Sequence, residues 1–486
     1  MPRGVIYDLL VIGGGVNGAG IARDAAGRGL ATLLAERADL ASATSSASSK
    51  LLHGGLRYLE QYEFRLVAEA LAEREILLRV AGHLAWPLRF VIPHVPELRP
   101  RWMIRLGLFL YDHLARRSVL PGSQAVRLDT PPYSSGLQPR LKHGFIYSDC
   151  RVDDSRLVVA NAADAARRGA RILVRTECLS ARREAGLWRA RLSNGKEISA
   201  RAIVNAAGPW VKHVLNERLG QPSSDAVRLV KGSHIVLPKL YDGDHAFILQ
   251  NDDRRVVFII PYEEEFTLVG TTDVPVDEAQ SAQPSEDEVR YLCAAAGRYL
   301  ARPIDAAQVR WRYAGVRPLY DDGADNPSAI TRDYTLRLDD DAGAAPVLSV
   351  FGGKITTYRR LAEQALEKLT PYFAGLKGPW TADEPLPGSK FTTRAVARQE
   401  VFERYRALPE MVVRGAFRRH GAETPAVLGD GRVGEEFGTG LTEREVRHFL
   451  ENEWASSAED VLWRRTKCGL HMTDVQRQRV AEVIGR

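Results

Sequence analysis

Two scarcities in the sequence exclude several classes of protein. The four cysteines show no Cys-x-x-Cys spacing, which argues against a disulfide framework or a cysteine-ligated zinc site and is typical of a reducing cytosol. No run of about 18 apolar residues occurs, so we expect no membrane-spanning helix. The N-terminal Met-Pro-Arg-Gly leads directly into an apolar run and resembles no signal peptide. We expect a cytoplasmic chain without a metal site.

An excess of one charge is also missing. The chain has 67 Lys and Arg residues against 61 Asp and Glu residues, which gives a net charge of +6. So small an excess in a chain of this length does not indicate nucleic acid as a partner. It suits an anionic substrate or an acidic lipid surface equally well. With 45% hydrophobic residues among 486, the chain is large enough for two or three domains.

A glycine-rich turn follows the first apolar run. Residues 7–12 have the composition of a buried parallel strand, residues 13–18 read Gly-Gly-Gly-Val-Asn-Gly, and a small-residue helix is expected over 19–28. In this context the glycines permit a tight turn, close approach of a pyrophosphate and close helix packing. A second strand over 31–35 is followed by Glu36, where a ribose hydroxyl would be held. The pattern predicts a dinucleotide site.

NAD and FAD share this pattern, and later segments favour FAD. A serine-rich loop over 42–50 and the His-Gly-Gly at 53–55 follow the second strand, where a longer cofactor would continue past its pyrophosphate. Apolar strands that end in small residues and glycine recur at 202–208 and 348–353. Three such junctions predict one cofactor domain built from discontinuous segments, whereas an NAD domain is usually contiguous.

These segments resemble the FAD-dependent glycerol-3-phosphate dehydrogenases of the bacterial, quinone-linked, aerobic type. The resemblance covers most of the chain and is looser over the last hundred residues, where 460–467 is the clearest piece. The segments that carry it are 8–20, 43–60, 228–238, 259–262, 268–273, 314–319, 330–334 and 351–359.

The resemblance implies oxidation of sn-glycerol 3-phosphate to dihydroxyacetone phosphate by hydride transfer to FAD. Electrons would then pass to ubiquinone or menaquinone. It also implies a homodimer attached peripherally to acidic lipids at the inner face of the cell membrane. The implied fold, α/β and α+β, has a Rossmann-like FAD-binding domain of the glutathione-reductase type, an antiparallel-sheet substrate domain and a helical C-terminal domain.

We place the domain boundaries from these motifs. The FAD-binding domain is expected at 1–85, 150–215 and 340–385, and the substrate and membrane-facing domain at 86–149 and 216–339. The helical C-terminal cap is expected at 390–486, after a Leu-Pro-Gly-Ser linker. The residues expected to contact FAD are Gly13, Gly14, Gly15, Asn17, Gly18, Glu36, Arg37, Thr44, Ser45, Ser46, Ser49, Lys50, His53, Gly54, Gly55, Ala207, Gly208, Gly353, Lys354, Ile355 and Thr356.

Arginine is the residue type best suited to a substrate phosphate, because its planar fork binds two oxygens at once. Arg317 and Arg332 lie in segments that carry the resemblance, and Arg57 and Tyr58 adjoin the proposed flavin loop. We assign these four residues to the substrate, and Arg317 also to catalysis.

Histidine is the natural candidate for the base that accepts the hydroxyl proton, because it titrates near physiological pH. We assign this role to His234, while His53, beside two glycines, is expected to bond the flavin or backbone. Lys354 could hold a substrate oxygen or stabilise negative charge on reduced flavin.

The segment 99–117 predicts an amphipathic helix with arginines at both ends. Its tryptophan and phenylalanine suit the headgroup layer of a membrane, although packing on the protein's own core is the commoner use of such a helix. Other functions stay open from the sequence. They are a glycerol-3-phosphate oxidase that reduces oxygen, an amine or amino-acid oxidase, and a non-catalytic FAD-binding redox sensor.

Overall fold

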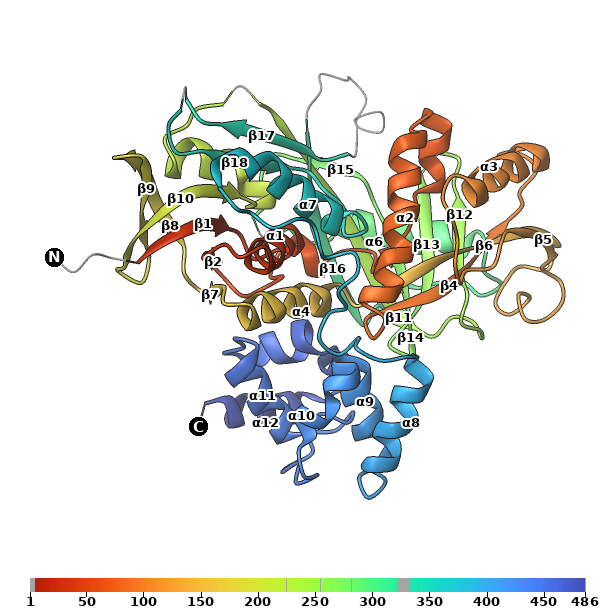
Figure 1. The fold of residues 1–486 in the computed structure, drawn as a ribbon. Helices are drawn as coiled ribbons and strands as arrows, with labels where there is room; N and C mark the ends of the chain where they lie inside the picture. Colours follow the sequence, from red (N-terminus) through yellow and green to blue (C-terminus); the bar gives the residue numbers. More distant parts are fainter. Residues whose placement is uncertain are drawn as a thin grey trace.

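The structure is a computed structural model that describes residues 5–485 except 224, 254, 281, 321–332 and 342. Two sheets lie side by side, and a group of C-terminal helices lies beneath the first sheet and the junction with the second (Figure 1). Within the described residues, no helix is long and apolar enough to cross a membrane.

The first sheet gathers its strands from the beginning, middle and end of the cofactor domain. Their order is β17-β18-β10-β1-β2-β7, and β9 joins β10 to β8. Pairings of β1 with β2 and β10, of β10 with β18, and of β2 with β7 are parallel. The strands are β1 (Ile6–Ile12), β2 (Thr32–Ala35), β7 (Arg171–Leu173), β8 (Cys178–Glu184), β9 (Leu187–Leu192), β10 (Glu197–Asn205), β17 (Thr335–Asp339) and β18 (Val347–Phe351).

The glycine junctions expected from the sequence meet at one edge of this sheet. Ile12 lies opposite both Ala35 and Asn205, and Asn205 lies opposite Ser349. The carboxyl ends of four parallel strands therefore form one row, which is where open α/β sheets bind ligands. The Rossmann-like FAD-binding fold expected from the sequence is confirmed.

Three helices pack against the first sheet: α1 (Val16–Gly27), α4 (Asp154–Arg167) and α7 (Tyr358–Leu369). They lie close together because their contact faces carry small residues. Gly20 of α1, for example, leaves no room for a side chain beside the Tyr358 ring. The short helix α5 (Val211–His213) follows β10. Helix α4 lies between this sheet and the C-terminal helices (Figure 1).

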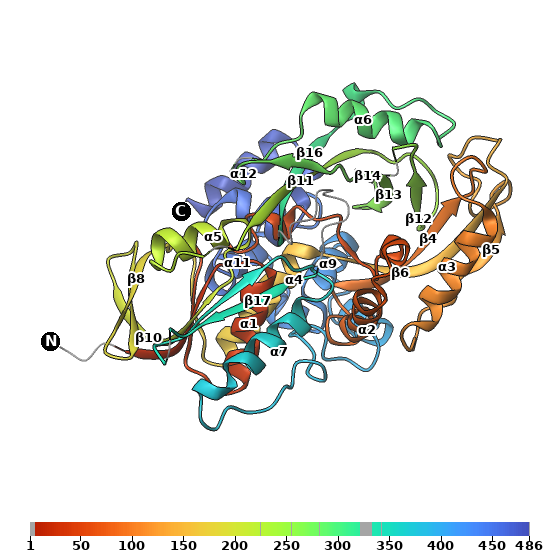
Figure 2. The same ribbon diagram turned by 90° about the horizontal axis from the view of Figure 1, so that it is seen from above.

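The second sheet is antiparallel except for the β12–β4 pair. Its order is β15-β11-β14-β13-β12-β4-β6-β3, with β16 on β11 and β5 on β6. Helix α6 (Glu286–Gly297) covers one face, and α2 (Phe64–Val80) and α3 (Arg101–His113) lie toward the other end (Figure 2). The strands are β3 (Leu51–Leu52), β4 (Ala85–Pro93), β5 (Gln124–Arg127), β6 (His143–Val152), β11 (Val227–Pro238), β12 (Ala246–Gln250), β13 (Val256–Tyr262), β14 (Phe266–Gly270), β15 (Val274–Val276) and β16 (Trp311–Tyr320).

The C-terminal segment is helical, as expected. Two apolar clusters form its core, one within the first helices and one within the last. Its helices are α8 (Arg394–Arg404), α9 (Glu410–His420), α10 (Thr424–Leu428), α11 (Glu443–Asn452) and α12 (Asp474–Ile484).

Candidate functional site

A cleft of about 930 Å³ opens at the carboxyl edge of the first sheet. Its walls are the glycine-rich turn, the segment from Glu36 through the serine-rich loop, the segment 206–214 and strand β16. The first sheet and the second sheet therefore share the cleft. Its position agrees with the rule for parallel sheets and with the site predicted from the strand–glycine junctions.

Two glycines of the turn at 13–18, Gly13 and Gly18, leave no room for a larger residue. Gly13 has φ +113°, and a Cβ there would lie 2.5 Å from the carbonyl oxygen of Ala206. A Cβ on Gly18 would lie 1.9 Å from the carbonyl oxygen of Gly13. Both glycines are thus required by the backbone path, and the path directs the start of α1 at the cleft, where its N–H groups favour a phosphate.

Glu36 fastens the second strand to this turn. Its carboxylate accepts hydrogen bonds from the backbone N–H of Gly14, at 2.6 Å, and of Ala38, at 2.8 Å. Burial raises the pKa of Glu36, and these two hydrogen bonds act in the opposite direction. The ribose contact predicted for Glu36 stays a prediction, while its hold on the turn is visible.

The serine-rich loop is tied to both sheets. Ser45 Oγ accepts from the N–H of Val16 at 3.0 Å, and Thr44 Oγ1 donates to the carbonyl oxygen of Val316 at 2.7 Å. The loop also lies against β16, since a Cβ on Gly315 would be 2.9 Å from the Ala47 carbonyl oxygen. These contacts place the loop across the cleft floor.

Lys50 is buried beneath this loop. Its ammonium donates to Asp154 at 2.8 Å and to the carbonyl oxygen of Ser46 at 2.8 Å. Although burial alone would lower it, Asp154 raises the pKa of Lys50. The pair fixes the conformation of the loop, and the predicted contact between Lys50 and the cofactor stays a prediction.

The strand–glycine junction after β18, residues 352–356, lies beside the glycine-rich turn. The Asn17 amide donates to the carbonyl oxygen of Gly352 at 3.2 Å, and Thr356 Oγ1 accepts from the N–H of His53 at 3.3 Å. Gly353, with φ +102°, leaves the space that the Asn17 amide occupies. Segments 13–18, 53–55 and 352–356 therefore meet, as the sequence predicted from their separate motifs.

His234 lies on β11 of the second sheet, between β14 and β16. Its ring stacks on the Tyr313 ring at 4.9 Å between centroids, and its Nε2 lies 2.8 Å from Ser49 Oγ. Gly270, opposite it on β14, leaves room for the imidazole. Burial, with Lys50 and Arg317 nearby, lowers the pKa of His234 to about 3. The ring is therefore neutral at physiological pH.

Arg317 shares a sheet face with His234. The β11–β16 register puts His234 opposite Tyr313 and Val230 opposite Arg317, and residues two apart on a strand share a face. The guanidinium donates to Asp273 at 2.7 Å and to the carbonyl oxygen of Thr272 at 2.8 Å. Of the other candidate arginines, Arg57 is half-buried in the short 3-10 helix Leu56–Gln61, and Arg332 lies outside the described residues.

Sequence reasoning missed several residues of this site. Trp210 lines the cleft with its ring 4.0 Å from the Arg37 guanidinium, and Tyr313 connects His234 to the loop through a bond to the Ser48 carbonyl oxygen. More unexpectedly, the cleft includes Trp463 and Arg464 of the C-terminal segment. Both lie in 460–467, which carried the resemblance without an assigned role.

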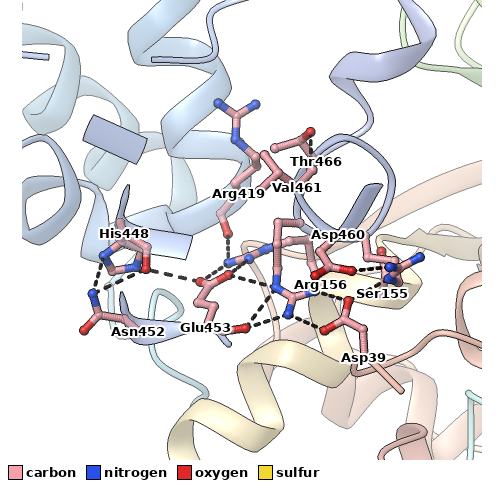
Figure 3. Close-up of polar contacts among 12 residues, drawn as sticks. Asp39, Ser155, Arg156, Arg419, His448, Asn452, Glu453, Asp460, Val461 and Thr466 are labelled. Atoms are coloured by element: carbon pink, nitrogen blue, oxygen red, sulfur yellow. Dashed lines mark hydrogen bonds and ion pairs between the residues drawn. The ribbon is translucent and has the colours of Figure 1, made fainter. Parts of the chain in front are cut away.

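A cluster of possible metal ligands lies in the C-terminal domain. Among the described residues, His420, His448 and Glu453 bring ligand atoms within 4.8 Å of one another. However, Glu453 already forms a two-point ion pair with Arg156 of α4, and His448 lies beside it (Figure 3). The guanidinium supplies the positive charge that a metal ion would bring, so we interpret this cluster as a contact between domains.

The residues around the cleft fit a bound dinucleotide. If Gly13 or Gly18 were any other residue type, its side chain would fill the space at the turn. In addition, two buried polar atoms, Lys354 Nζ and Asn17 Oδ1, have no hydrogen-bond partner within the described part of the chain. Buried polar atoms are almost always paired. Both lie where the glycine-rich turn meets segment 352–356, and a group bound beside this junction would pair with them.

Comparison with known proteins identifies the family. The sequence matches the model described as FAD dependent oxidoreductase over residues 8–359, and the C-terminal domain of alpha-glycerophosphate oxidase over 379–485. The aerobic glycerol-3-phosphate dehydrogenase of Escherichia coli (strain K12) is 50% identical over 98% of this chain and 96% of that protein. This chain belongs to the FAD-dependent glycerol-3-phosphate dehydrogenase family. It is an oxidoreductase, and its cofactor is FAD.

Two further relatives are similar to this chain over nearly its whole length. The glycerol-3-phosphate dehydrogenase from Bacillus halodurans, solved in complex with FAD, aligns with a TM-score of 0.72 and 25% identity over 99% of this chain and 94% of that one. The D-erythritol 1-phosphate dehydrogenase of Brucella abortus (strain 2308) is 49% identical over 98% of this chain and 97% of that protein. Family members of similar identity thus act on different polyol phosphates.

Proposed function

We propose that this chain oxidises sn-glycerol 3-phosphate to dihydroxyacetone phosphate and delivers the electrons to a membrane quinone. The observation that carries the proposal is the face shared by Arg317 and His234, which adjoins the serine-rich loop of the FAD cleft. This arrangement combines a group for an anion with a nitrogen that can take a proton. Relatives such as the Escherichia coli enzyme, similar over nearly the whole chain, support glycerol 3-phosphate as the substrate.

Each residue has a separate task in this proposal. Arg317, whose orientation is fixed by Asp273 and Thr272, binds the phosphate together with Arg57 and Arg332. Bound FAD supplies a two-electron acceptor for the hydride from C2 of the substrate.

The proton of the substrate hydroxyl needs an acceptor. Because the His234 imidazole is neutral, one of its ring nitrogens can accept it. The low pKa makes His234 a weak base in the absence of ligand. A phosphate dianion bound near Arg317 would raise this pKa, since an anion stabilises imidazolium.

Anaerobic bleaching of the flavin tests the substrate directly. Holoprotein is mixed with sn-glycerol 3-phosphate, D-erythritol 1-phosphate, glycerol or glycine, and absorbance near the flavin maximum is followed. The proposal expects rapid bleaching with glycerol 3-phosphate, slower bleaching with the longer phosphate and none with the other two. Faster reduction by D-erythritol 1-phosphate would reassign the substrate, reduction by glycine would indicate an amino-acid oxidase, and a flavin that no compound bleaches would indicate a redox sensor.

The surface of α3 supports the membrane part of the proposal. Ile104, Leu108 and Tyr111 are buried against the protein, which accounts for one apolar face. Trp102 and Phe109 are nevertheless 66% and 53% exposed, and Met103 and Leu106 are also exposed. A helix whose only task is to cover the protein's core would not need a second, exposed apolar face. Arginines around it suit acidic lipids of the inner leaflet.

The electron acceptor distinguishes this proposal from an oxygen-using oxidase. We expect substrate-reduced protein to reduce a soluble ubiquinone or menaquinone analogue much faster than it forms hydrogen peroxide from air. A peroxide yield close to one per substrate, with slow quinone reduction, would instead assign the oxidase activity. The proposed homodimer is tested by light scattering, which should give twice the chain mass of 53.9 kDa.

A further inference from the structure

A helical turn of the C-terminal domain, Asp460–Arg465, reaches the cofactor cleft. Trp463 and Arg464 from this turn, and Glu459 just before it, line the cleft together with the glycine-rich turn and the serine-rich loop. The remainder of the C-terminal domain lies beneath α4 and the junction of the two sheets (Figure 1). This one turn therefore extends from a domain that otherwise has no part in the described cofactor site.

The turn is anchored to the cofactor domain at Asp39. Arg464 Nε lies 2.6 Å from the Asp39 carboxylate, and Arg465 contributes two further contacts at 2.7 and 2.8 Å. Asp39 and Arg465 are fully buried, and Figure 3 shows Asp39 facing the C-terminal residues across this contact. Asp39 follows Glu36 by three residues, so the anchor acts on the segment predicted to hold the adenosine ribose.

The same turn is anchored to the second sheet through an aromatic contact. The Trp463 ring stacks on Trp311 of β16, with 4.8 Å between centroids and 30° between planes. Trp311 in turn contacts Tyr313 at 4.8 Å. Trp463 and Arg464 thus connect the two walls of the cleft, the strand end after β2 on one side and β16 on the other. The cleft cannot widen here while both contacts persist.

We propose that the turn Asp460–Arg465 is a latch that retains FAD. Trp463 and Arg464 form part of the cofactor-binding surface. The Trp463 ring matches the flat rings of a dinucleotide, and the Arg464 guanidinium, paired with Asp39, Glu459 and Asp460, fixes the turn against the cofactor domain. The ion pair with Asp39 holds them in position. Escape of the cofactor on this side requires the latch to leave Asp39 and Trp311, so the C-terminal domain controls the FAD release rate.

The release rate of FAD from the holoprotein tests the latch. Free-flavin fluorescence is followed after dilution of wild type, W463A and R464Q, and the apoproteins are titrated with FAD. Each variant should release FAD at least about tenfold faster and bind it correspondingly less tightly, which corresponds to about 1.4 kcal/mol. The conservative W463F keeps an aromatic ring against Trp311 and should stay near wild type.

Two matched variants separate the latch from general docking of the domain. Arg175→Gln removes a 2.6 Å ion pair to Asp460 of the same turn, yet Arg175 does not line the cleft. Arg479→Gln removes contacts within the C-terminal domain alone. Both should keep FAD as wild type does.

Equal FAD release from wild type, W463A and R464Q would overturn the proposal. Release from R175Q as fast as from R464Q would also overturn it, because domain docking rather than the cleft residues would then hold FAD. Circular dichroism of each apoprotein confirms that the chain is folded. None of these measurements depends on the substrate, so failure of the latch and failure of the proposed activity are independent results.

Discussion

The Lys354 ammonium lies 4.0 Å from the centre of the Tyr58 ring, and within the described residues it has no hydrogen-bond partner. The two residues are almost 300 positions apart and were assigned to the site from separate motifs. A cation on an aromatic face is stabilised by the ring quadrupole, but a buried ammonium still needs acceptors. We infer that a bound cofactor or substrate supplies them.

Replacement of Lys354 with methionine should slow flavin reduction by a factor of about 10² to 10³, because a preorganised cation would be lost where charge develops. Stopped-flow reduction by glycerol 3-phosphate measures this, and the FAD content should stay close to wild type. K354R should recover part of the rate. The exposed Lys368 on α7 provides the control K368M, and equal rates in K354M and K368M would remove Lys354 from the site.

Replacement of His234 with alanine should lower the rate of flavin reduction while FAD stays bound. Since burial lowers the pKa of His234 to about 3, the imidazole loses its proton below the assay range. Between pH 5 and 8 the kcat/KM of the wild type should therefore show no titration of His234. The pH profiles of wild type and variant should have the same shape. A wild-type rate of flavin reduction in H234A would sink the base assignment.

The contact between Arg156 and Glu453 should make stability depend on acid pH. Although burial acts in the opposite direction, Arg156 lowers the pKa of Glu453 to about 2. Because the folded-state pKa lies below the ordinary value of 4.5, the stabilisation is complete above pH 4.5 and is lost as the pH falls toward 2.

The variant E453Q should be less stable than wild type by about 3 to 5 kcal/mol at pH 7, because Arg156 is left as a buried unpaired charge. The difference should shrink as the pH approaches 2. Urea unfolding at several pH values measures both effects. E482Q, at an exposed pair with Arg479, is the control, and an equal loss in both variants would contradict the network's role.

Alanine at Gly18 should prevent tight FAD binding, since its Cβ would lie 1.9 Å from the carbonyl oxygen of Gly13. The purified protein should be colourless, and titration with FAD should show affinity reduced by about a hundredfold or more. G297A, at a position where a Cβ meets no atom within 4 Å, should remain yellow. A fully loaded G18A protein would contradict the role assigned to the turn.

Serine at Trp102, Leu106 and Phe109 should abolish flotation with vesicles of acidic lipid. Neutralising Arg105, Arg116 and Arg117 should weaken binding mainly at low salt, because charge attraction is screened. Liposome flotation measures both.

A matched control replaces Val396, Met411 and Val475 with serine, since these are exposed apolar residues of the C-terminal domain. This control should float with vesicles as wild type does. Undiminished flotation of both α3 variants would remove this helix from the membrane contact.

The cofactor domain and much of its cleft follow from local features of the sequence. Gly13 and Gly18 could be predicted because local steric clashes exclude side chains from the turn. Strands β1, β10 and β18 could be predicted because buried parallel strands need apolar runs that end at the ligand-binding edge of the sheet. The family, the FAD cofactor and the helical C-terminal domain also followed from motifs in order along the chain.

How distant residues act on one another depends on the packing of the folded chain. His234 is neutral because burial beside Lys50 and Arg317 disfavours the imidazolium, and an isolated motif carries no information about that environment. Likewise, Arg464 meets Asp39 across more than 400 residues. Contacts of this kind depend on how the domains pack. The sequence alone therefore did not predict that C-terminal residues line the FAD cleft.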